Sequence, residues 1–289
     1  MSKIFNLVEK YNLIDFSEEN DPRANRANIA SATEPAIHCS PSITEPITPS
    51  NRVVNLRLSA ASPIFPFDTG HHEVADQYRI IRTKLLHHPR KPRVVVVSSS
   101  TAGDGKTVTT INLAASLALK QNLQVLLIDG DLRRPRIAAM LGLPLSPGLA
   151  DVLAGTVTLD AAIVRAAEVP NLFILPAGEA LVGSAELLDS PNWAAFVAQV
   201  RNRFTQVLFD APPIALLADY ELIQLSCDGA IVVVRPDHSN RTACLKALDV
   251  VPSDKLLGVV LNCSENWWLW KTSNRYSYYQ YSPTLLDKE

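Results

Sequence analysis

A short loop with two glycines carries the residues whose types and spacing are best suited to chemistry. From residue 100 the sequence reads STAGDGKT, close to the pattern G-x-x-x-x-G-K-[ST] with Ser100 in place of the first glycine. Glycines let successive backbone N–H groups point at one anion, and the N-terminus of a following helix favours the same negative charge. Lys106 can reach the β- and γ-phosphates of a nucleotide, and the hydroxyl of Thr107 can bind Mg²⁺. The predicted nucleotide-binding residues are Ala102, Gly103, Asp104, Gly105, Lys106, Thr107 and Val108.

Aspartates end two apolar runs further along the chain. VLLIDGD ends in Asp129 and Asp131, and VLFDAPP contains Asp210. Carboxylates at the tip of a buried strand are costly unless a positive group meets them, and Mg²⁺ beside the nucleotide would do so. Alternation puts Asp129 and Asp131 on the same side of an extended strand, where one could hold a magnesium water and the other could accept a proton. A helix cap or a turn is the alternative role for each aspartate.

These motifs define two sets of site residues. The predicted catalytic residues are Lys106, Asp129, Asp131 and Asp210. The predicted metal ligands are Thr107, Asp131 and Asp210. Arg133 and Arg134 follow the second carboxylate and could bind phosphate or stabilise transferred charge. A solvated pair, or a contact between subunits, is the alternative for these two arginines.

Apolar runs and helical periodicity alternate along the chain, and the elements they predict must position these residues. Buried parallel strands are expected at 93–100, 124–131, 206–213, 229–236 and 256–263. Helices are expected at 73–86, 107–120 and 191–203. The alternation predicts an α/β fold with a doubly wound, mostly parallel sheet and helices on both faces. In such sheets ligands bind at the carboxyl ends of the strands, where the loop and the aspartates lie.

Composition divides the chain into three parts. Seven of the 20 prolines lie in the first 66 residues, which contain no glycine. We therefore expect residues 1–70 to be a disordered arm rich in Pro, Ser and Thr, with an apolar pattern at 1–16 that is either a short docking helix or a frayed end. Residues 71–266 form the expected nucleotide-binding domain, and residues 267–289 form a flexible tail rich in Trp and Tyr.

The overall composition excludes several classes of protein. Hydrophobic residues make up 47% of the 289 residues, enough for a sizeable core, so the chain is not disordered throughout. A formal net charge of −2 argues against a strongly basic nucleic-acid binder. The four cysteines form no C-x-x-C pair, which favours reduced thiols in the cytosol. We expect neither a membrane-spanning segment nor a secretory signal.

Three motifs in order, SSSTAGDGKT, LLIDGDLRRP and VLFDAPP, resemble those of the bacterial protein-tyrosine kinases (BY-kinases) of capsule and exopolysaccharide systems. The resemblance covers residues from about 73 to 281 and implies a P-loop NTPase fold. It also implies that Lys106 and Thr107 bind ATP·Mg²⁺, that Asp129 and Asp131 form the second acidic motif, and that Asp210 holds the Walker B position.

The same resemblance extends to a helix before the first strand. Members of the family carry an E-x-x-R-x-x-R helix that packs subunits into a ring. Asp76, Arg79 and Arg82 align with it, with aspartate in place of glutamate. The charge is kept and the reach is shorter, so the resemblance implies a homo-oligomer with a weakened version of this contact.

A cluster of tyrosines near the end of the chain also resembles the family, whose members autophosphorylate such a tail. Four of the seven tyrosines lie within six residues, at Tyr276, Tyr278, Tyr279 and Tyr281. They are the expected phosphoacceptors. An adhesive aromatic tail is the alternative, because Trp267, Trp268 and Trp270 lie just upstream.

The resemblance implies an autokinase that transfers the γ-phosphate of ATP to these tyrosines in trans and regulates polymerisation and export of exopolysaccharide or capsule. It further implies a transmembrane adaptor of the polysaccharide co-polymerase type and a cognate tyrosine phosphatase. The expected place is then the cytoplasm, at the inner face of the plasma membrane through that partner, and no nucleic acid is expected to bind. One alternative is a partition or septum-site ATPase, whose loop carries an extra lysine where Thr101 stands here. Another is an ATP-binding chain-length regulator without catalysis.

Overall fold

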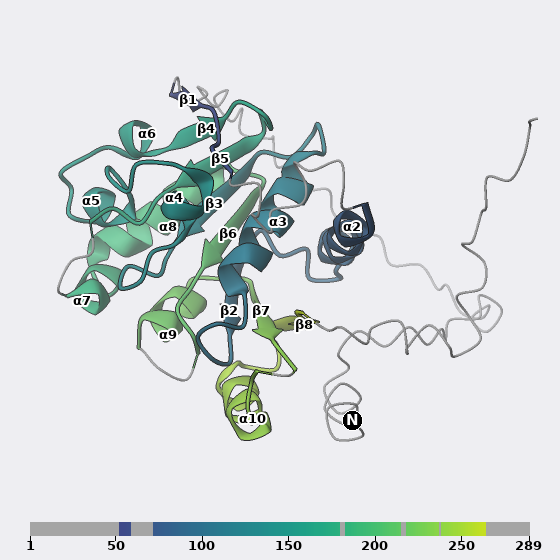
Figure 1. Ribbon diagram of the computed structural model, residues 1–289. Coiled ribbons are helices and arrows are strands. Elements are labelled where there is room, and N and C mark those ends of the chain that lie inside the picture. Colours follow the sequence, from purple (N-terminus) through teal and green to yellow (C-terminus); the bar gives the residue numbers. More distant parts are fainter. Residues whose placement is uncertain (1–51, 59–71, 180–182, 215–217, 237, 264–289) are drawn as a thin grey trace, which may run out of the picture.

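The computed structural model describes residues 52–58, 72–179, 183–214, 218–236 and 238–263. They form an eight-stranded sheet in the order β1-β4-β5-β3-β6-β2-β7-β8 (Figure 1). Every neighbouring pair is parallel except β4 and β5. The strands are β1 (Val53–Val54), β2 (Val94–Ser99), β3 (Val125–Asp129), β4 (Val164–Ala166), β5 (Leu172–Leu175), β6 (Gln206–Asp210), β7 (Gly229–Val234) and β8 (Leu256–Leu261).

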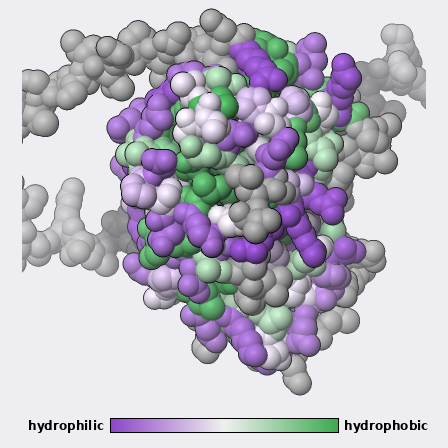
Figure 2. Space-filling model, turned by 90° about the vertical axis from the view of Figure 1, so that its left-hand side faces the viewer, coloured by the Kyte–Doolittle hydropathy of each residue, from purple (hydrophilic) through white to green (hydrophobic). Residues whose placement is uncertain are grey.

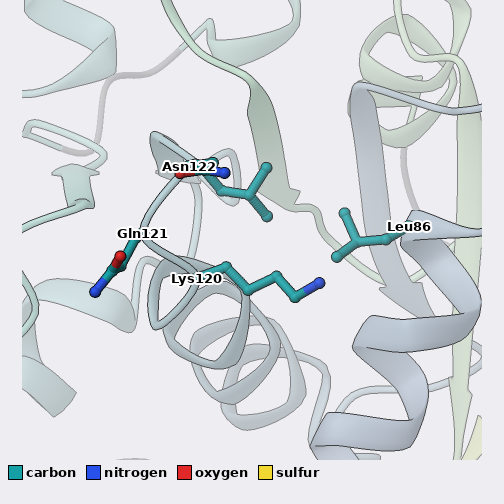
Figure 3. A pocket seen from close by; sticks show the side chains of 5 residues that line it. Leu86, Lys120, Gln121 and Asn122 are labelled. Carbon is teal, nitrogen blue, oxygen red and sulfur yellow. The ribbon is translucent and has the colours of Figure 1, made fainter.

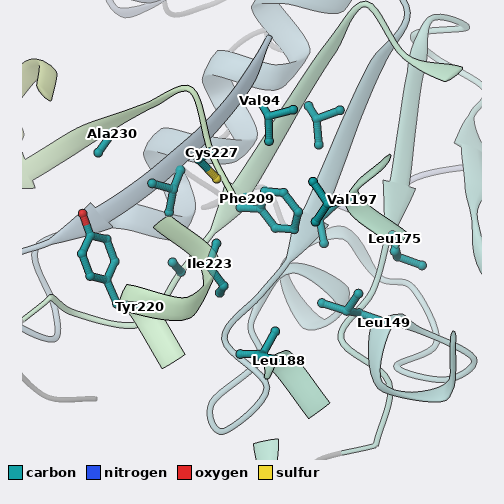
Figure 4. Close-up of a cluster of buried hydrophobic side chains, with 14 of the residues drawn as sticks. Val94, Leu149, Leu175, Leu188, Val197, Phe209, Tyr220, Ile223, Cys227 and Ala230 are labelled. Atoms are coloured by element: carbon teal, nitrogen blue, oxygen red, sulfur yellow. The ribbon is translucent and has the colours of Figure 1, made fainter. Parts of the chain in front are cut away.

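Helices cover both faces of this sheet. They are α2 (His72–Leu86), α3 (Lys106–Ala118), α4 (Ile137–Leu141), α5 (Leu149–Leu153), α6 (Leu159–Ala162), α7 (Ser184–Leu188), α8 (Pro191–Arg203), α9 (Ala218–Leu225) and α10 (Arg241–Val250). One hydrophobic cluster joins α2, α3 and α4 to one face, and a larger one joins α5 to α10 to the other (Figure 4). The predicted fold class, a mostly parallel sheet between helices, is confirmed.

The strand β2 shows why the central strands read as unbroken apolar runs. Val94 and Val96 point into the larger cluster, whereas Val95 and Val97 point into the cluster under α3. All four side chains are completely buried. A strand buried on both faces has no position left for a polar residue until it reaches its end. The polar residues that follow β2, β3 and β6 therefore gather at the carboxyl edge of the sheet.

Residues 52–58 differ from the expectation of a disordered arm. Val53 and Val54 pair in parallel with β4, and the N–H of Arg57 donates to the carbonyl oxygen of Leu141 at 3.0 Å. Val54, Leu56 and Leu58 alternate with polar residues and pack against the cluster under α3. This period of two is a strand signal that a count of prolines does not register. The remaining residues of the expected arm, with the pattern at 1–16, lie outside the described part of the chain.

The sequence analysis also missed β4, β5 and the shorter helices. β4 has three residues and β5 four, below the length at which an apolar run can be told from a loop. β5 nevertheless pairs with β3 and extends the sheet beyond the catalytic strands. Within the residues that the structure describes, no helix is long and apolar enough to cross a membrane. Figure 2 shows the side of the molecule that carries α5 and α7, where hydrophilic residues surround small hydrophobic areas.

Candidate active site

The loop between β2 and α3 has the backbone expected of a phosphate cradle. Gly103 and Gly105 have φ values of 93° and 91°, in the left-handed region that favours glycine. Gly105 is the N-cap of α3 and provides no side-chain cap. The first N–H groups of α3 can therefore donate hydrogen bonds to a ligand at the positive end of the helix dipole. Ala102 is exposed, and Val108 is half-buried one residue after Thr107.

Three strands and a helix bring the predicted catalytic groups together. Lys106 Nζ lies 3.0 Å from Asp131 Oδ2 and 3.4 Å from Asp210 Oδ2. The hydroxyl of Thr107 donates to Asp210 Oδ2 at 2.7 Å. Asp210 is completely buried, at the end of β6 and directly across from Asp129 of β3. Residues 106, 131 and 210, far apart in the sequence, thus form one charged cluster at the carboxyl edge.

Burial and the neighbouring charges shift the pKa values of the groups in this cluster. Burial and the neighbouring Asp210 raise the pKa of Asp129 to about 7. The pKa of Asp210 is raised as well, because its burial outweighs the attraction of Lys106. Burial alone would lower the pKa of Lys106, but the carboxylates of Asp210 and Asp131 raise it. The carboxylates therefore outnumber the positive charge that the chain itself supplies at this point.

Asp129 and Asp131, which the alternation rule placed on one side of a strand, lie next to each other but have different further partners: the N–H of Asp131 donates to Asp129 Oδ1 at 3.3 Å. β3 ends at Asp129, the N–H of Gly130 still donates to the carbonyl oxygen of Asp210 of β6 at 2.8 Å, and the chain turns from residue 132. Asp129 Oδ2 accepts from the N–H groups of Arg136 and Ile137, both at 3.0 Å. Asp129 thus binds backbone N–H groups at the start of α4, although the N-cap residue of that helix is Arg136. Asp131 Oδ1 accepts from the N–H of Arg134 at 3.1 Å, and its Oδ2 faces Lys106.

Arg133 points away from the phosphate loop. Its Nε and Nη2 donate to the two carboxylate oxygens of Asp219, at 2.9 and 3.2 Å. The hydroxyl of Ser184 donates to the same carboxylate at 2.9 Å. Asp219 is buried and its pKa is lowered, since these bonds outweigh its burial. Arg133 therefore joins the turn after β3 to Asp219 of α9, to which Ser184 of α7 also donates, and the sequence analysis predicted neither contact.

The donor set fits a nucleotide with Mg²⁺. Magnesium in such sites takes one or two carboxylates, with phosphate oxygens and water completing its shell. Among the described residues no group of three His, Cys, Asp or Glu side chains could hold a metal ion by itself. The two carboxylates of Asp131 and Asp210 and the hydroxyl of Thr107 are thus sufficient only if the substrate supplies further oxygens. The uncapped N-terminus of α3 has N–H groups that can donate to those phosphates.

The residues expected in subunit contacts lie on α2. Asp76 and Arg79 are exposed and form an ion pair with each other on the helix surface. Arg82 turns inward, where its Nη1 donates to the carbonyl oxygen of Ser116 in α3 at 2.8 Å. The three residues are therefore not equivalent: two are open to a partner and one fastens α2 to α3.

A surface hollow of about 400 Å³ lies away from this site, between the C-terminal ends of α2 and α3 (Figure 3). It is lined by Leu86, Lys120, Gln121, Asn122 and Leu123. The cradle lies at the opposite end of α3, so the hollow takes no part in the candidate active site.

Comparison with known proteins decides the family. The family described as an AAA domain matches residues 92–249, more than half of the chain. The tyrosine-protein kinase YwqD of Bacillus subtilis (strain 168) is 31% identical over 218 residues, which cover 74% of this chain and 90% of that protein. The tyrosine-protein kinase CpsD of Streptococcus pneumoniae serotype 4 is 33% identical over 193 residues, with coverage of 65% and 83%. The chain belongs to the bacterial protein-tyrosine kinase family.

Solved structures related to this family have the same fold. The chimerical protein CapA2B2 matches with a TM-score of 0.66 and 25% identity, over 72% of this chain and 92% of that one. The kinase domain of VpsO matches with a TM-score of 0.60 and 30% identity, over 66% and 97%. The family match contains Lys106, Asp129, Asp131 and Asp210. The tyrosines expected as phosphoacceptors in a BY-kinase (Tyr276, Tyr278, Tyr279 and Tyr281) lie outside the described residues.

Proposed function

We propose that this chain is an ATP-dependent protein-tyrosine kinase that phosphorylates the tyrosines of its own C-terminal segment. The observation that carries the proposal is the cluster of Lys106, Thr107, Asp131 and Asp210 beside a bare helix N-terminus, in a member of the bacterial protein-tyrosine kinase family. A lysine and a hydroxyl meet two buried carboxylates at the mouth of an anion cradle. This arrangement suits phosphoryl transfer, in which positioning and charge neutralisation do most of the work.

The chain's own groups have distinct roles in this mechanism. The N–H groups of the loop and of the first turn of α3 bind the β- and γ-phosphates, and Lys106 turns from Asp131 toward the γ-phosphate as the nucleotide enters. Thr107, Asp131 and Asp210 would hold Mg²⁺, which would neutralise phosphate charge. Asp210 fixes the position of the Thr107 hydroxyl by accepting its hydrogen bond. The rigid β2, β3 and β6 fix these groups relative to one another.

The acceptor in this proposal is a tyrosine hydroxyl, whose ordinary pKa is near 10. A new bond forms between its oxygen and the γ-phosphorus, the bond from that phosphorus to the β-phosphate oxygen breaks, and the phenolic proton passes to a base. Asp129 remains the predicted base, because a pKa of about 7 lets it accept a proton at neutral pH. ADP and phosphotyrosine are the products.

The proposed acceptors are Tyr276, Tyr278, Tyr279 and Tyr281, phosphorylated in trans by a neighbouring copy. Asp76 and Arg79, exposed on α2, are available for the contact between copies. The proposal includes a cytoplasmic protein held at the inner face of the membrane by a transmembrane adaptor, opposed by a tyrosine phosphatase. Phosphorylation and dephosphorylation of this chain would control the assembly of exopolysaccharide or capsule. Its support is the family to which the chain belongs.

The test is phosphotyrosine mapping by mass spectrometry after incubation with ATP·Mg²⁺. Lys106→Met is expected to reduce labelling by about a hundredfold or more, because it removes a charge that acts on the transferred group. Lys120→Met, two residues beyond the far end of the same helix, is the matched control and should label as the wild type does. Replacement of the four tyrosines by phenylalanine should abolish labelling in trans. Labelling that survives Lys106→Met would refute the kinase.

A further inference from the structure

Asp104 stands in the phosphate loop, one residue before Gly105, and its carboxylate is completely buried. Its Oδ2 accepts from the hydroxyl of Ser100 at 2.8 Å and from the N–H of Thr101 at 2.9 Å. Its Oδ1 accepts from the hydroxyl of Ser239 and faces His238 Nδ1 at 3.1 Å. Burial would raise the pKa of Asp104, but these bonds, that of Ser239 first, lower it. The side chain therefore ties the loop to the segment between β7 and α10.

The backbone of the same residue is tied to a third segment. Asn262, just after β8, donates from Nδ2 to the carbonyl oxygen of Asp104 at 2.8 Å. A Cβ at Gly105 would come within 2.0 Å of that Nδ2, so the contact exists only because residue 105 is glycine. The N–H of Asn262 in turn donates to the carbonyl oxygen of Val234 at the end of β7. The amide that reaches the loop is thus itself anchored to the sheet.

The direction of this bond has a consequence for phosphate binding. In a trans peptide the carbonyl oxygen and the next N–H point in opposite directions. When Asn262 holds the oxygen of Asp104 on the β8 side, the N–H of Gly105 points to the other side of the loop. Glycines at 103 and 105 give the unrestrained loop many alternative backbone conformations, which are lost when the nucleotide binds. A restraint present before binding reduces that loss.

We propose that Asn262 is a positioning residue for nucleotide binding: by holding the peptide between Asp104 and Gly105 it presets the phosphate loop. The inference rests on the proposed binding of ATP. The carboxylate of Asp104, bound to Ser239, holds the same loop from the other side. Asn262 contacts neither the reacting atoms nor the cluster around Lys106, so it acts through the loop.

The test compares the dissociation constant of a fluorescent ATP analogue with Mg²⁺ in the wild type, Asn262→Ala and Asn262→Asp. Loss of this partly buried hydrogen bond is expected to weaken binding about five- to fiftyfold in Asn262→Ala. Asn262→Asp keeps the volume but cannot donate and adds a negative charge, so its loss should be larger. The rate of phosphorylation at saturating ATP should stay close to that of the wild type, and amide exchange at 103–106 in nucleotide-free protein should be faster.

Asn240→Ala is the matched control. Asn240 Oδ1 accepts from the N–H of Thr242 and caps α10, close to His238 and Ser239, but it has no bond to the loop. It should lower the melting temperature slightly and leave nucleotide affinity unchanged. The proposal is overturned if Asn262→Ala binds the analogue as tightly as Asn240→Ala does, if only the melting temperature changes, or if the wild type binds no ATP. Binding by the wild type without tyrosine labelling would refute the kinase and leave this inference standing.

Discussion

The two ends of the same mostly parallel sheet each hold an aspartate, half-buried at one end and completely buried at the other, and they shift its pKa in opposite directions. At the amino end, Asp228 Oδ2 accepts from the N–H groups of Arg93 and Val94, both at 2.8 Å, and the carboxylate pairs with Arg201. Burial would raise the pKa of Asp228, but these donors lower it. At the carboxyl end, Asp210 is buried beside other carboxylates and its pKa is raised. One end is electrically complete within the chain, and the other is not.

This difference indicates what each end is for. Asp228 joins the starts of β2 and β7 to α8, and its charge is matched by that of Arg201. At the carboxyl end Asp129, Asp131 and Asp210 act on the single ammonium group of Lys106. An excess of buried negative charge disfavours the folded state unless a cation enters. The carboxyl end, where negative charge is unmatched, is therefore the end at which a metal and a nucleotide can bind. The unmatched charge lowers the stability of the free protein and makes this binding favourable.

Asp210→Asn tests this comparison with the largest expected effect. Tyrosine labelling should fall by about a hundredfold or more, because a metal ligand and the acceptor of the Thr107 bond are both altered. The free energy of unfolding of the metal-free protein should not fall, since a buried charge of raised pKa has been removed. Radiolabel transfer and urea unfolding measure the two. A large loss of stability would show that the carboxyl end is as complete as the amino end.

Asp228→Asn is the counterpart at the amino end. The variant should lose about 2 kcal/mol of unfolding free energy, because a charged acceptor of several hydrogen bonds becomes neutral. Urea denaturation measures this. Labelling by the folded variant should equal that of the wild type. A kinase defect of more than a few fold at full folding would mean that the two ends are coupled.

The pH dependence of stability should have opposite signs at the two ends. Asp129 in the folded, metal-free protein titrates at about 7, above its ordinary value of 3.8, so the folded state binds more protons between these values. The wild type should gain on the order of 1 kcal/mol relative to Asp129→Asn as pH falls from 7.5 to 6.5. Asp228, with a lowered pKa, contributes stability above 3.8 that is lost as pH falls below it. Urea midpoints of both variants across pH measure this, and parallel curves would contradict it.

Arg133→Lys sharpens the comparison with the smallest expected effect. Arg133 and Asp219 form a completed pair at the otherwise incomplete end. Lysine keeps the charge but loses the two-pronged bond, so kcat should fall by roughly tenfold or less through a displaced Asp131. The KM for ATP should change less than kcat. Steady-state kinetics measures both, and Arg133→Met should be worse than Arg133→Lys. Equal defects in the two variants would show that the paired hydrogen bonds from Arg133 to Asp219 do not position Asp131.

Local sequence patterns were strong wherever the chain is regular and long. The unbroken valines of β2 and the helical spacing of α2, α3 and α8 predicted these elements because burial on two faces, or on one stripe, forces the pattern. β4, β5 and α4 to α7 are too short to carry such a signal. Val53 and Val54 were assigned to the arm because their partner, β4, lies more than a hundred residues later.

What the sequence by itself determined is the nature of the site: a cradle for phosphate, a lysine, a hydroxyl and carboxylates at strand ends. These follow from residue types and local geometry, which the chain carries wherever it goes. Only the tertiary structure decided how they are shared. In the folded chain Asp131 pairs with Lys106, and Asp129 accepts from the backbone at the start of α4. Arg133 pairs with Asp219, and Asn262 donates to the phosphate loop. These pairings join residues that are distant in the sequence. Such residues come into contact only when the strands have assembled into the sheet.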